Sequence, residues 1–189
     1  NRTETLIFTD KQQVYKTRLS DFDDTKASAL GTYLPTKLSM DEGEKVLEVI
    51  CPGNYRKNLL LFFENGKVAR LDLVSYETKT NRKKLINAYC DKSPLVAVYM
   101  IGEEIDMAVF SSDGRALVFN TTLLQLKTSR TTQGVAVMNL KKNHKLISAA
   151  PLADTVIKNV SRYRVRSLPA AGALLRDEDR GETQMSLID

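Results

Sequence analysis

Lysine and arginine side chains recur in short polar stretches of this sequence, and the chemistry that they could do is to bind phosphate groups. The candidates fall into four groups along the chain: Lys26; Lys79, Arg82, Lys83 and Lys84; Lys127 and Arg130; and Lys141, Lys142 and Lys145. Hydroxyl groups and backbone amides within 128–134 could add contacts to phosphate oxygens. The pattern favours a polyanion that is bound along its backbone rather than read base by base.

The excess of positive charge lies in the middle of the chain. Residues 1–50 hold 7 basic and 9 acidic side chains, residues 51–150 hold 15 and 8, and residues 151–189 hold 6 and 6. Such an excess attracts polyanions, but solvated loops on a protein-binding surface carry similar charge. A protein-interaction surface with solvated basic loops therefore remains the alternative.

Residues for catalysis or metal binding are sparse. The single histidine, His144, lies in a lysine-rich turn, and neither a phosphate-binding glycine loop nor a nucleophile elbow is present. Cys51 and Cys90 lack metal-site spacing, so we expect both to be buried free thiols in a reducing compartment. The sequence predicts no catalytic residue, no metal site and no cofactor, which leaves an enzymatic role with the least support.

A repeat of about fifty residues positions these loops. Phe8, Phe62 and Phe110 each end an apolar run, and their separations are 54 and 48 residues. The second and third are followed by Asn65-Gly66 and Asp113-Gly114, which are strong hairpin signals between apolar runs. A strand-rich period of this length indicates propeller-like blades, in which equivalent loops share one rim.

The sequence thus predicts an all-β fold, a propeller-like disc of about three to four four-stranded blades. We place the domain at 1–175, with repeats at 5–51, 58–101 and 105–150, a partial blade at 155–168 and a flexible charged tail at 176–189. We expect strands at 33–38 and 160–168; the second would carry Arg162, Arg164 and Arg166 on one face and pair with the N-terminal strand. No apolar run suits a membrane span, and the polar start without Met suggests a chain cut from a longer polypeptide.

Two segments carry a family resemblance. The better copy comprises Phe110-Ser-Ser-Asp-Gly-Arg115 and Arg130-Thr-Thr-Gln-Gly-Val-Ala-Val-Met-Asn-Leu140, and Phe62-Phe-Glu-Asn-Gly-Lys67 is a weaker one. Over about residues 5–150 the pattern resembles the C-terminal domain of bacterial type IIA topoisomerase A subunits, those of DNA gyrase and topoisomerase IV. The resemblance implies a β-pinwheel with strand exchange between blades. It also implies a non-catalytic disc that bends duplex DNA on a basic rim, working with a DNA-cleavage core and an ATPase subunit in the bacterial cytoplasm.

The sequence departs from that family in three ways. The family disc has five or six blades, whereas 189 residues allow three or four. The glutamine-arginine-glycine box of gyrase is absent, which favours a divergent or topoisomerase IV-like relative, or a chain that starts after the first blade; the choice between gyrase and topoisomerase IV stays open. Arg162-Tyr163 resembles the family's arginine and nucleophilic tyrosine, but the surrounding core sequence is missing, so we expect Tyr163 to be a strand residue.

Overall fold

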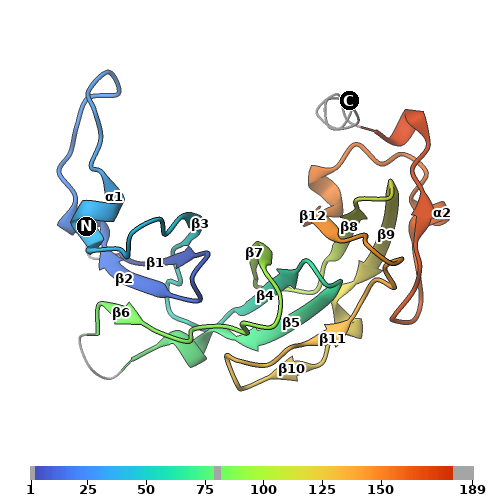
Figure 1. Ribbon diagram of the computed structural model, residues 1–189, viewed down its shortest axis with the longest axis horizontal. Coiled ribbons are helices and arrows are strands. Elements are labelled where there is room, and N and C mark those ends of the chain that lie inside the picture. Colours follow the sequence, from blue (N-terminus) through green and yellow to red (C-terminus); the bar gives the residue numbers. More distant parts are fainter. Residues whose placement is uncertain (1–2, 79–81, 181–189) are drawn as a thin grey trace.

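Three sheets follow one another along an open arc in the computed structural model, which describes residues 3–78 and 82–180 (Figure 1). Their strands pair antiparallel except for the short parallel pair of β10 and β5. The sheet orders are β3-β1-β2-β6, β7-β4-β5-β10 with β11 also on β5, and β12-β8-β9-β13; we call them blades 1, 2 and 3. The strands are β1 (Glu4–Thr9), β2 (Val14–Arg18), β3 (Val46–Ile50), β4 (Asn58–Phe63), β5 (Lys67–Asp72), β6 (Lys84–Leu85), β7 (Leu95–Ile101), β8 (Asp106–Ser111), β9 (Arg115–Asn120), β10 (Leu126–Lys127), β11 (Val135–Ala136), β12 (Leu146–Pro151) and β13 (Ala173–Leu174).

Helical structure is short. The α-helices are α1 (Leu34–Leu38) and α2 (Val160–Tyr163), and the 3₁₀ turns are η1 (Leu19–Asp21), η2 (Leu73–Tyr76), η3 (Thr121–Leu123), η4 (Leu152–Asp154) and η5 (Asp177–Asp179). None of the described helices is long and apolar enough to cross a membrane. Because the helices are short and the described chain is built mainly of sheets, the all-β, propeller-like fold predicted from the sequence is confirmed.

Each blade is built on the hairpin that the sequence marks. The anchor phenylalanines lie opposite the residue six positions later: Phe8 opposite Val14, Phe62 opposite Val68 and Phe110 opposite Ala116. The residue four positions after each anchor has a positive φ: 55° at Gln12, 78° at Gly66 and 73° at Gly114. A tight turn needs this left-handed backbone, which glycine adopts readily and Gln12 adopts at some cost.

The fourth strand of every blade comes from the following repeat. Strand β6 pairs with β2, β10 and β11 pair with β5, and β13 pairs with β9. The same backbone hydrogen bond anchors each exchanged strand to the hairpin turn of its acceptor: Ala88 N–H to Gln12 O at 2.8 Å, Val137 N–H to Gly66 O at 2.9 Å and Leu175 N–H to Gly114 O at 2.9 Å. Strand exchange is thus a regular feature that recurs three times.

Apolar cores fill the spaces between blades. In β4, Leu59, Leu61 and Phe63 pack in the core shared with blade 1, whereas Leu60 and Phe62 pack in the core shared with blade 3. Both faces of this strand are buried, which explains its unbroken apolar run. A smaller third cluster joins blade 3 to the C-terminal segment through the buried Tyr163 and Leu175.

Two of the predicted strands are wrong. Residues 34–38 form α1, and Pro35 lies in its first turn. Proline is tolerated there because the N–H groups of the first turn have no hydrogen-bond partner within the helix. Within 160–168 the chain forms α2 and then a single parallel bridge from Arg164 to Val118 of β9. The expected pairing with the N-terminal strand is also wrong, because blades 1 and 3 stand at opposite ends of the arc (Figure 1).

The boundary of the expected tail differs as well. Residues 177–179 form η5, and Asp179 is buried against α2, so order extends beyond residue 176; the remainder of the predicted tail, 181–189, lies outside the described residues. The expected partial blade at 155–168 forms no sheet of its own in the described chain, because β13 completes blade 3 instead.

Candidate nucleic-acid interface

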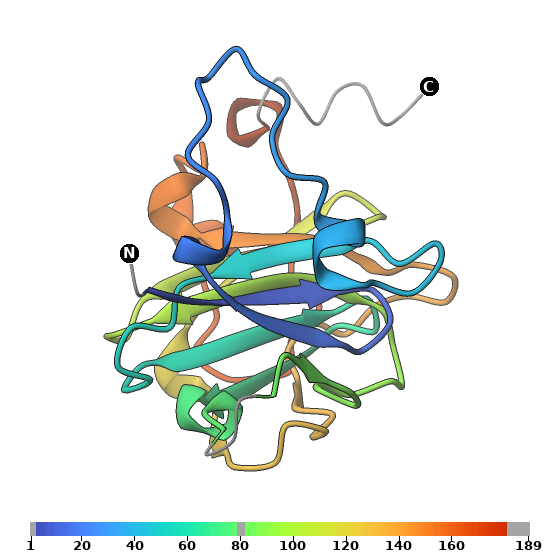
Figure 2. The same cartoon turned by 90° about the vertical axis from the view of Figure 1, so that its left-hand side faces the viewer.

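Two exchanged segments bring basic residues to the outer edge of the arc. Residues 82–85 and 124–136, here called the crossover segments, run beneath blades 1 and 2 and lie along the lower side in both views (Figures 1 and 2). The second segment runs parallel to β5 at β10, near the end of β5 that leads into η2, and returns antiparallel to it at β11, whereas the first pairs antiparallel with β2 at β6. We call this side of the molecule the crossover edge.

Arg82 and Lys83 are the most available cations of the crossover edge. Both are exposed, and neither side chain has a hydrogen bond, ion pair or ring contact within the described part of the chain. The backbone of Lys83 is held in place, because its carbonyl accepts a 2.8 Å hydrogen bond from the Lys16 N–H. The structure therefore holds two free positive charges at a defined place.

Lys84 is held by contacts within the protein. Its Nζ lies 3.1 Å from an Asp41 carboxylate oxygen and 5.3 Å from the centre of the Tyr15 ring. Burial alone would lower the pKa of Lys84, but its hydrogen bonds with Asp41 and Tyr15 raise the pKa above its ordinary value. This lysine serves mainly to hold β6 against the turn that follows α1.

The two cations of the second crossover segment are only partly available to bind a partner. Lys127 donates to Gln125 Oε1 at 2.7 Å, and the Arg130 guanidinium lies 5.7 Å from the centre of the buried Tyr76 ring. Arg130 is half-buried there. It links the crossover to η2 of blade 2 while part of its charge still faces solvent.

The fourth predicted group, Lys141, Lys142 and Lys145, lies elsewhere. Lys141 is 3.5 Å from Asp113, and Lys145 is 2.9 Å from Glu64, so both belong to the edge that carries the hairpin turns. Lys142 is exposed in the same turn. A six-residue strand separates this edge from the crossover edge, which corresponds to roughly 20 Å. The structure therefore does not bring these lysines together with Arg82 and Lys83.

The remaining predicted cations are peripheral or outside the described chain. Lys26 is exposed in the long segment 22–33, which rises away from blade 1 on the side opposite β6 (Figures 1 and 2). Lys79 lies outside the described residues. Lys26 therefore does not join the crossover edge.

Sequence reasoning missed three cations beside Arg82 and Lys83. A groove of about 800 Å³ next to these residues is also lined by Lys16, Arg18 and Lys37. The alternation of Lys16 and Arg18 along β2 was a usable signal, because alternate residues share one face of a strand. Lys37 could not be found this way, because its segment was expected to be a strand rather than a helix.

Lys16 forms part of this groove as a structural cation. Its Nζ lies 3.3 Å from Glu4 and 3.1 Å from the Thr78 hydroxyl, and it sits 5.5 Å from the centre of the Tyr55 ring. Its side chain is only 6% exposed. With Glu4 and Asp21 as the acidic members of the lining, the groove keeps a basic excess.

The residues considered for chemistry occupy structural positions. His144 is exposed, with Nδ1 3.1 Å from Ser112 Oγ. Tyr163 ends α2, not a strand, and is buried with its hydroxyl donating to Asp179. Cys90 is buried as expected, but the expectation for Cys51 is wrong, since that thiol is exposed. Within the described ranges no cluster of His, Cys, Asp and Glu could hold a metal ion.

Comparison with known families gives a match at both ends of the arc. The family described as "DNA gyrase C-terminal domain, beta-propeller" matches residues 3–51 and 106–153, together a little over half of the chain. The DNA gyrase A protein of Metamycoplasma arthritidis is 22% identical over 93% of this chain and 21% of its own length. A probable chloroplastic or mitochondrial gyrase A protein of Oryza sativa is 26% identical over 86% of this chain and 18% of its own. The chain thus spans about a fifth of these relatives.

Solved structures share the fold. The C-terminal domain of DNA topoisomerase IV superposes with a TM-score of 0.79 at 17% identity, covering 92% of this chain and 58% of that one. The E. coli ParC C-terminal domain gives a TM-score of 0.68 at 14% identity, covering 93% and 77%. At such identities the likeness concerns the fold, and it extends through all three blades.

Proposed function

Because the chain belongs to the family of DNA gyrase C-terminal β-propeller domains, we propose that it binds duplex DNA along the crossover edge and bends it without catalysing a reaction itself. Its relatives are gyrase A proteins. In the parent enzyme the domain would present the bent duplex to a DNA-cleavage core, while an ATPase subunit drives the change of DNA topology. The setting that fits this role is the bacterial cytoplasm, and the domain needs no cofactor for it.

The observation that carries the proposal is the pair Arg82 and Lys83. These cations are exposed, unpaired within the described chain and adjacent to a groove that Arg18 and Lys37 also line. Phosphate contacts from Lys and Arg release counterions and supply affinity without base recognition. Their position beside β6, which is hydrogen-bonded to β2, suits a partner with a regular spacing of charge.

Bending sets the scale of the interaction that is needed. Bending a site of 20–30 base pairs costs on the order of 1–6 kcal/mol. Phosphate contacts from Arg82 and Lys83 alone would barely offset the free energy of bending. We therefore assign the groove cations and the exposed part of Arg130 to the same DNA-binding surface. The salt dependence of binding reports how many of them take part.

A salt titration tests the proposal. Fluorescence anisotropy with a labelled duplex of about 40 base pairs should show binding whose log–log slope against salt is several units, near −0.9 for each phosphate neutralised. An unrelated duplex of equal length should bind equally well. Absence of binding at low salt, or a strong preference for one sequence, would contradict the proposal.

One observation favours a second role, the docking of another protein. Strands β3, β7 and β12 line the inner side of the arc (Figure 1). Leu47 of β3 and Ile147 of β12, both 40% exposed, line a groove of about 220 Å³ together with residues of β7. Replacing Leu47 and Ile147 by lysine should leave DNA binding intact.

A capture experiment with the purified cleavage core separates the two roles. If the chain binds no duplex but captures the core, and the two lysine substitutions abolish that capture, protein docking is the better account.

A further inference from the structure

The groove beside Arg82 and Lys83, here called the basic groove, is large enough to hold a small ligand. Its volume is about 800 Å³, and sites that enclose small molecules commonly measure roughly 300–1,000 Å³. Three separate elements supply its cations, which are Lys16 and Arg18 from β2, Lys37 from α1, and Arg82 and Lys83 from the first crossover segment. The charge therefore surrounds a hollow instead of lying on a flat surface.

Burial separates the floor of the basic groove from its walls. Lys16 is buried, so it lies at the floor. The exposed cations of the walls are Arg18, Lys37, Arg82 and Lys83. Lys16 and Arg18 are alternate residues of β2, so they share one face of the strand at a separation of roughly 7 Å. The walls thus carry four positive charges that solvent, and hence a dissolved anion, can reach.

The two carboxylates that line the basic groove are held by donors of the protein. Glu4 accepts a hydrogen bond from the Tyr55 hydroxyl. Asp21 accepts from the Arg18 N–H at 3.0 Å and from the Thr17 hydroxyl at 3.1 Å, and these hydrogen bonds lower the pKa of Asp21. Five cations stand against these two carboxylates in the lining, so the groove keeps a positive excess.

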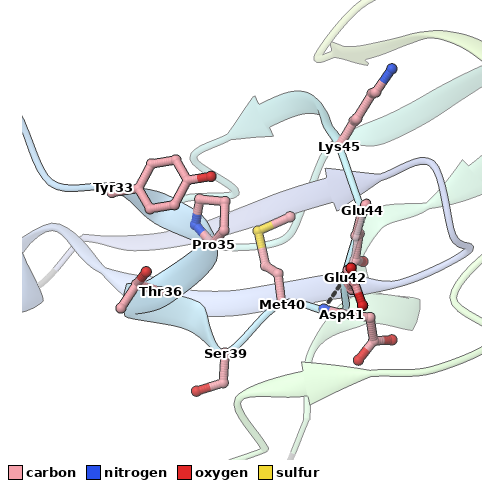
Figure 3. Close-up of a pocket in the computed structure, with 10 residues that line it drawn as sticks. Tyr33, Pro35, Thr36, Ser39, Met40, Asp41, Glu42, Glu44 and Lys45 are labelled. Carbon is pink, nitrogen blue, oxygen red and sulfur yellow. Dashed lines mark hydrogen bonds between the residues drawn. The ribbon is translucent and has the colours of Figure 1, made fainter.

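A neighbouring hollow has the opposite charge. Its volume is about 560 Å³, and the charged residues of its lining are one cation, Lys45, and three carboxylates, Asp41, Glu42 and Glu44. Ser39 belongs to the lining of both spaces, and its side chain points away from that of Met40 (Figure 3). Of these two adjoining spaces, the basic groove is the one that suits an anion.

The lining of the basic groove fits phosphate groups and offers nothing for a base. Lysine, arginine and hydroxyl side chains donate to phosphate oxygens. Tyr15 is the only aromatic residue among the described residues of the lining, and at 1% exposure it presents no ring on which a base could stack. A duplex is stiff over about 150 base pairs and would lie across the mouth of the groove, whereas a short phosphate chain is thin and flexible enough to enter it.

We propose that the basic groove binds a short chain of linked phosphates, as found in inorganic tripolyphosphate or in the triphosphate group of a nucleotide. Binding of this ligand stands on the groove alone. The ligand also neutralises Arg82 and Lys83, so it competes with duplex DNA; this second statement rests on the proposed function. The groove is then a place at which the concentration of a small polyphosphate regulates how much DNA the domain holds.

Calorimetric titration of the 189-residue chain with sodium tripolyphosphate at low ionic strength tests the binding. We expect saturable binding at one site per chain, and at least about tenfold weaker binding of orthophosphate, because linked groups reinforce one another. ATP should bind as tightly as tripolyphosphate, since the lining does not contact a base. Absence of saturable binding, equal binding of orthophosphate, or clearly tighter binding of ATP would overturn the proposal.

Substitutions locate the site. Lys37→Gln and Arg18→Gln each remove one exposed cation from a different wall, and we expect each to weaken tripolyphosphate binding about tenfold. A denaturant midpoint like that of the parent shows that each variant is folded. Lys142→Gln removes the same charge at the turn edge and should bind tripolyphosphate as the parent does. Equal losses in all three variants would mean attraction by overall charge, which would overturn the site.

Displacement of a labelled duplex by tripolyphosphate separates this proposal from the proposed function. We expect the duplex to be released over the concentration range in which calorimetry shows the groove filling. If the chain binds tripolyphosphate but no duplex, the DNA function fails and the polyphosphate site stands. If it binds duplex but no tripolyphosphate, the polyphosphate site fails and the DNA function stands. If both bind without competing, the shared use of Arg82 and Lys83 is wrong.

Discussion

At the scale of single residues, the role of a charged side chain depends on its partners more than on its type. Lys83 and Lys84 are adjacent in sequence, yet Lys83 is free and exposed within the described chain whereas Lys84 is held by Asp41 and Tyr15. The sequence indicates that basic residues cluster here. It could not separate them, because Asp41 lies 43 residues away and meets Lys84 only when the strands exchange.

Asp179 offers a test of a buried charge. It is 1% exposed and accepts hydrogen bonds from the Tyr163 hydroxyl at 2.7 Å and from the Lys158 and Asn159 N–H groups at 2.6 and 3.1 Å. Asp179→Asn puts an amide where these donors converge, and we expect it to lower the free energy of unfolding by roughly 1–3 kcal/mol. Urea unfolding measures the loss. Asp177→Asn is the control, because the Asp177 side chain is 99% exposed.

The same carboxylate predicts a pH dependence. Burial alone would raise the pKa of Asp179, but the hydrogen bonds from Tyr163, Asn159 and Lys158 outweigh it and hold the pKa at about 2. An unfolded aspartate titrates near ~3.9. Asp179 therefore stabilises the fold fully above that pH, and the contribution is lost as the pH falls through about 2. The stability gap between the parent and Asp179→Asn should shrink between about pH 5 and pH 2; a gap independent of pH would contradict this.

At the scale of elements, hairpins were predictable from sequence and crossovers were not. Asn65-Gly66 and Asp113-Gly114 determine local turns, so β4, β5, β8 and β9 follow from near-neighbour chemistry. The exchanged strands are two residues long and are stabilised by a neighbouring blade, so their local pattern is weak. Segments 33–38 and 160–168 are wrong as strands for a different reason: each contains a short helix, α1 or α2, and a short apolar pattern does not distinguish such a helix from a strand.

The close approach at Gly134 tests the crossover. Gly134→Ala and Gly114→Ala both put alanine at a φ near +70°, which costs roughly 1–2 kcal/mol. Only at residue 134 would the new methyl group meet an acceptor strand, at 2.2 Å from Val68 O, whereas residue 114 has open space. We expect Gly134→Ala to lose at least about 1 kcal/mol more of unfolding free energy than Gly114→Ala. Equal losses would show that β11 does not pack as described.

At the scale of the whole molecule, the arc gives the basic residues their direction. The cores between blades fix the angle between neighbouring blades, and the crossover edge follows the resulting curve (Figure 1). The family resemblance and the repeat were sufficient to predict this architecture. They did not show that the turn-edge lysines 141, 142 and 145 lie a strand's length from the crossover edge, because the repeat gives the order of loops but not the edge that each one occupies.

Curvature predicts a change in DNA shape. A duplex of about 40 base pairs labelled at both ends should show increased energy transfer when saturated with the protein, because its ends approach as it follows the arc. Saturating binding with unchanged transfer would mean that the domain holds straight DNA. The same duplex with a flexible gap at its centre serves as the control, since it should bind more tightly when bending is part of the binding cost.

The most direct test of the crossover edge compares two charge reversals in one salt titration. Arg82→Glu with Lys83→Glu changes the crossover edge, and Lys141→Glu with Lys142→Glu makes the same change in charge at the turn edge. We predict that the first pair weakens duplex binding at every salt concentration and reduces the log–log slope by about 2, since each lost phosphate contact removes about 0.9. The second pair should leave the slope nearly unchanged. Equal effects of the two pairs, or a larger effect of the second, would contradict the assignment of DNA to the crossover edge.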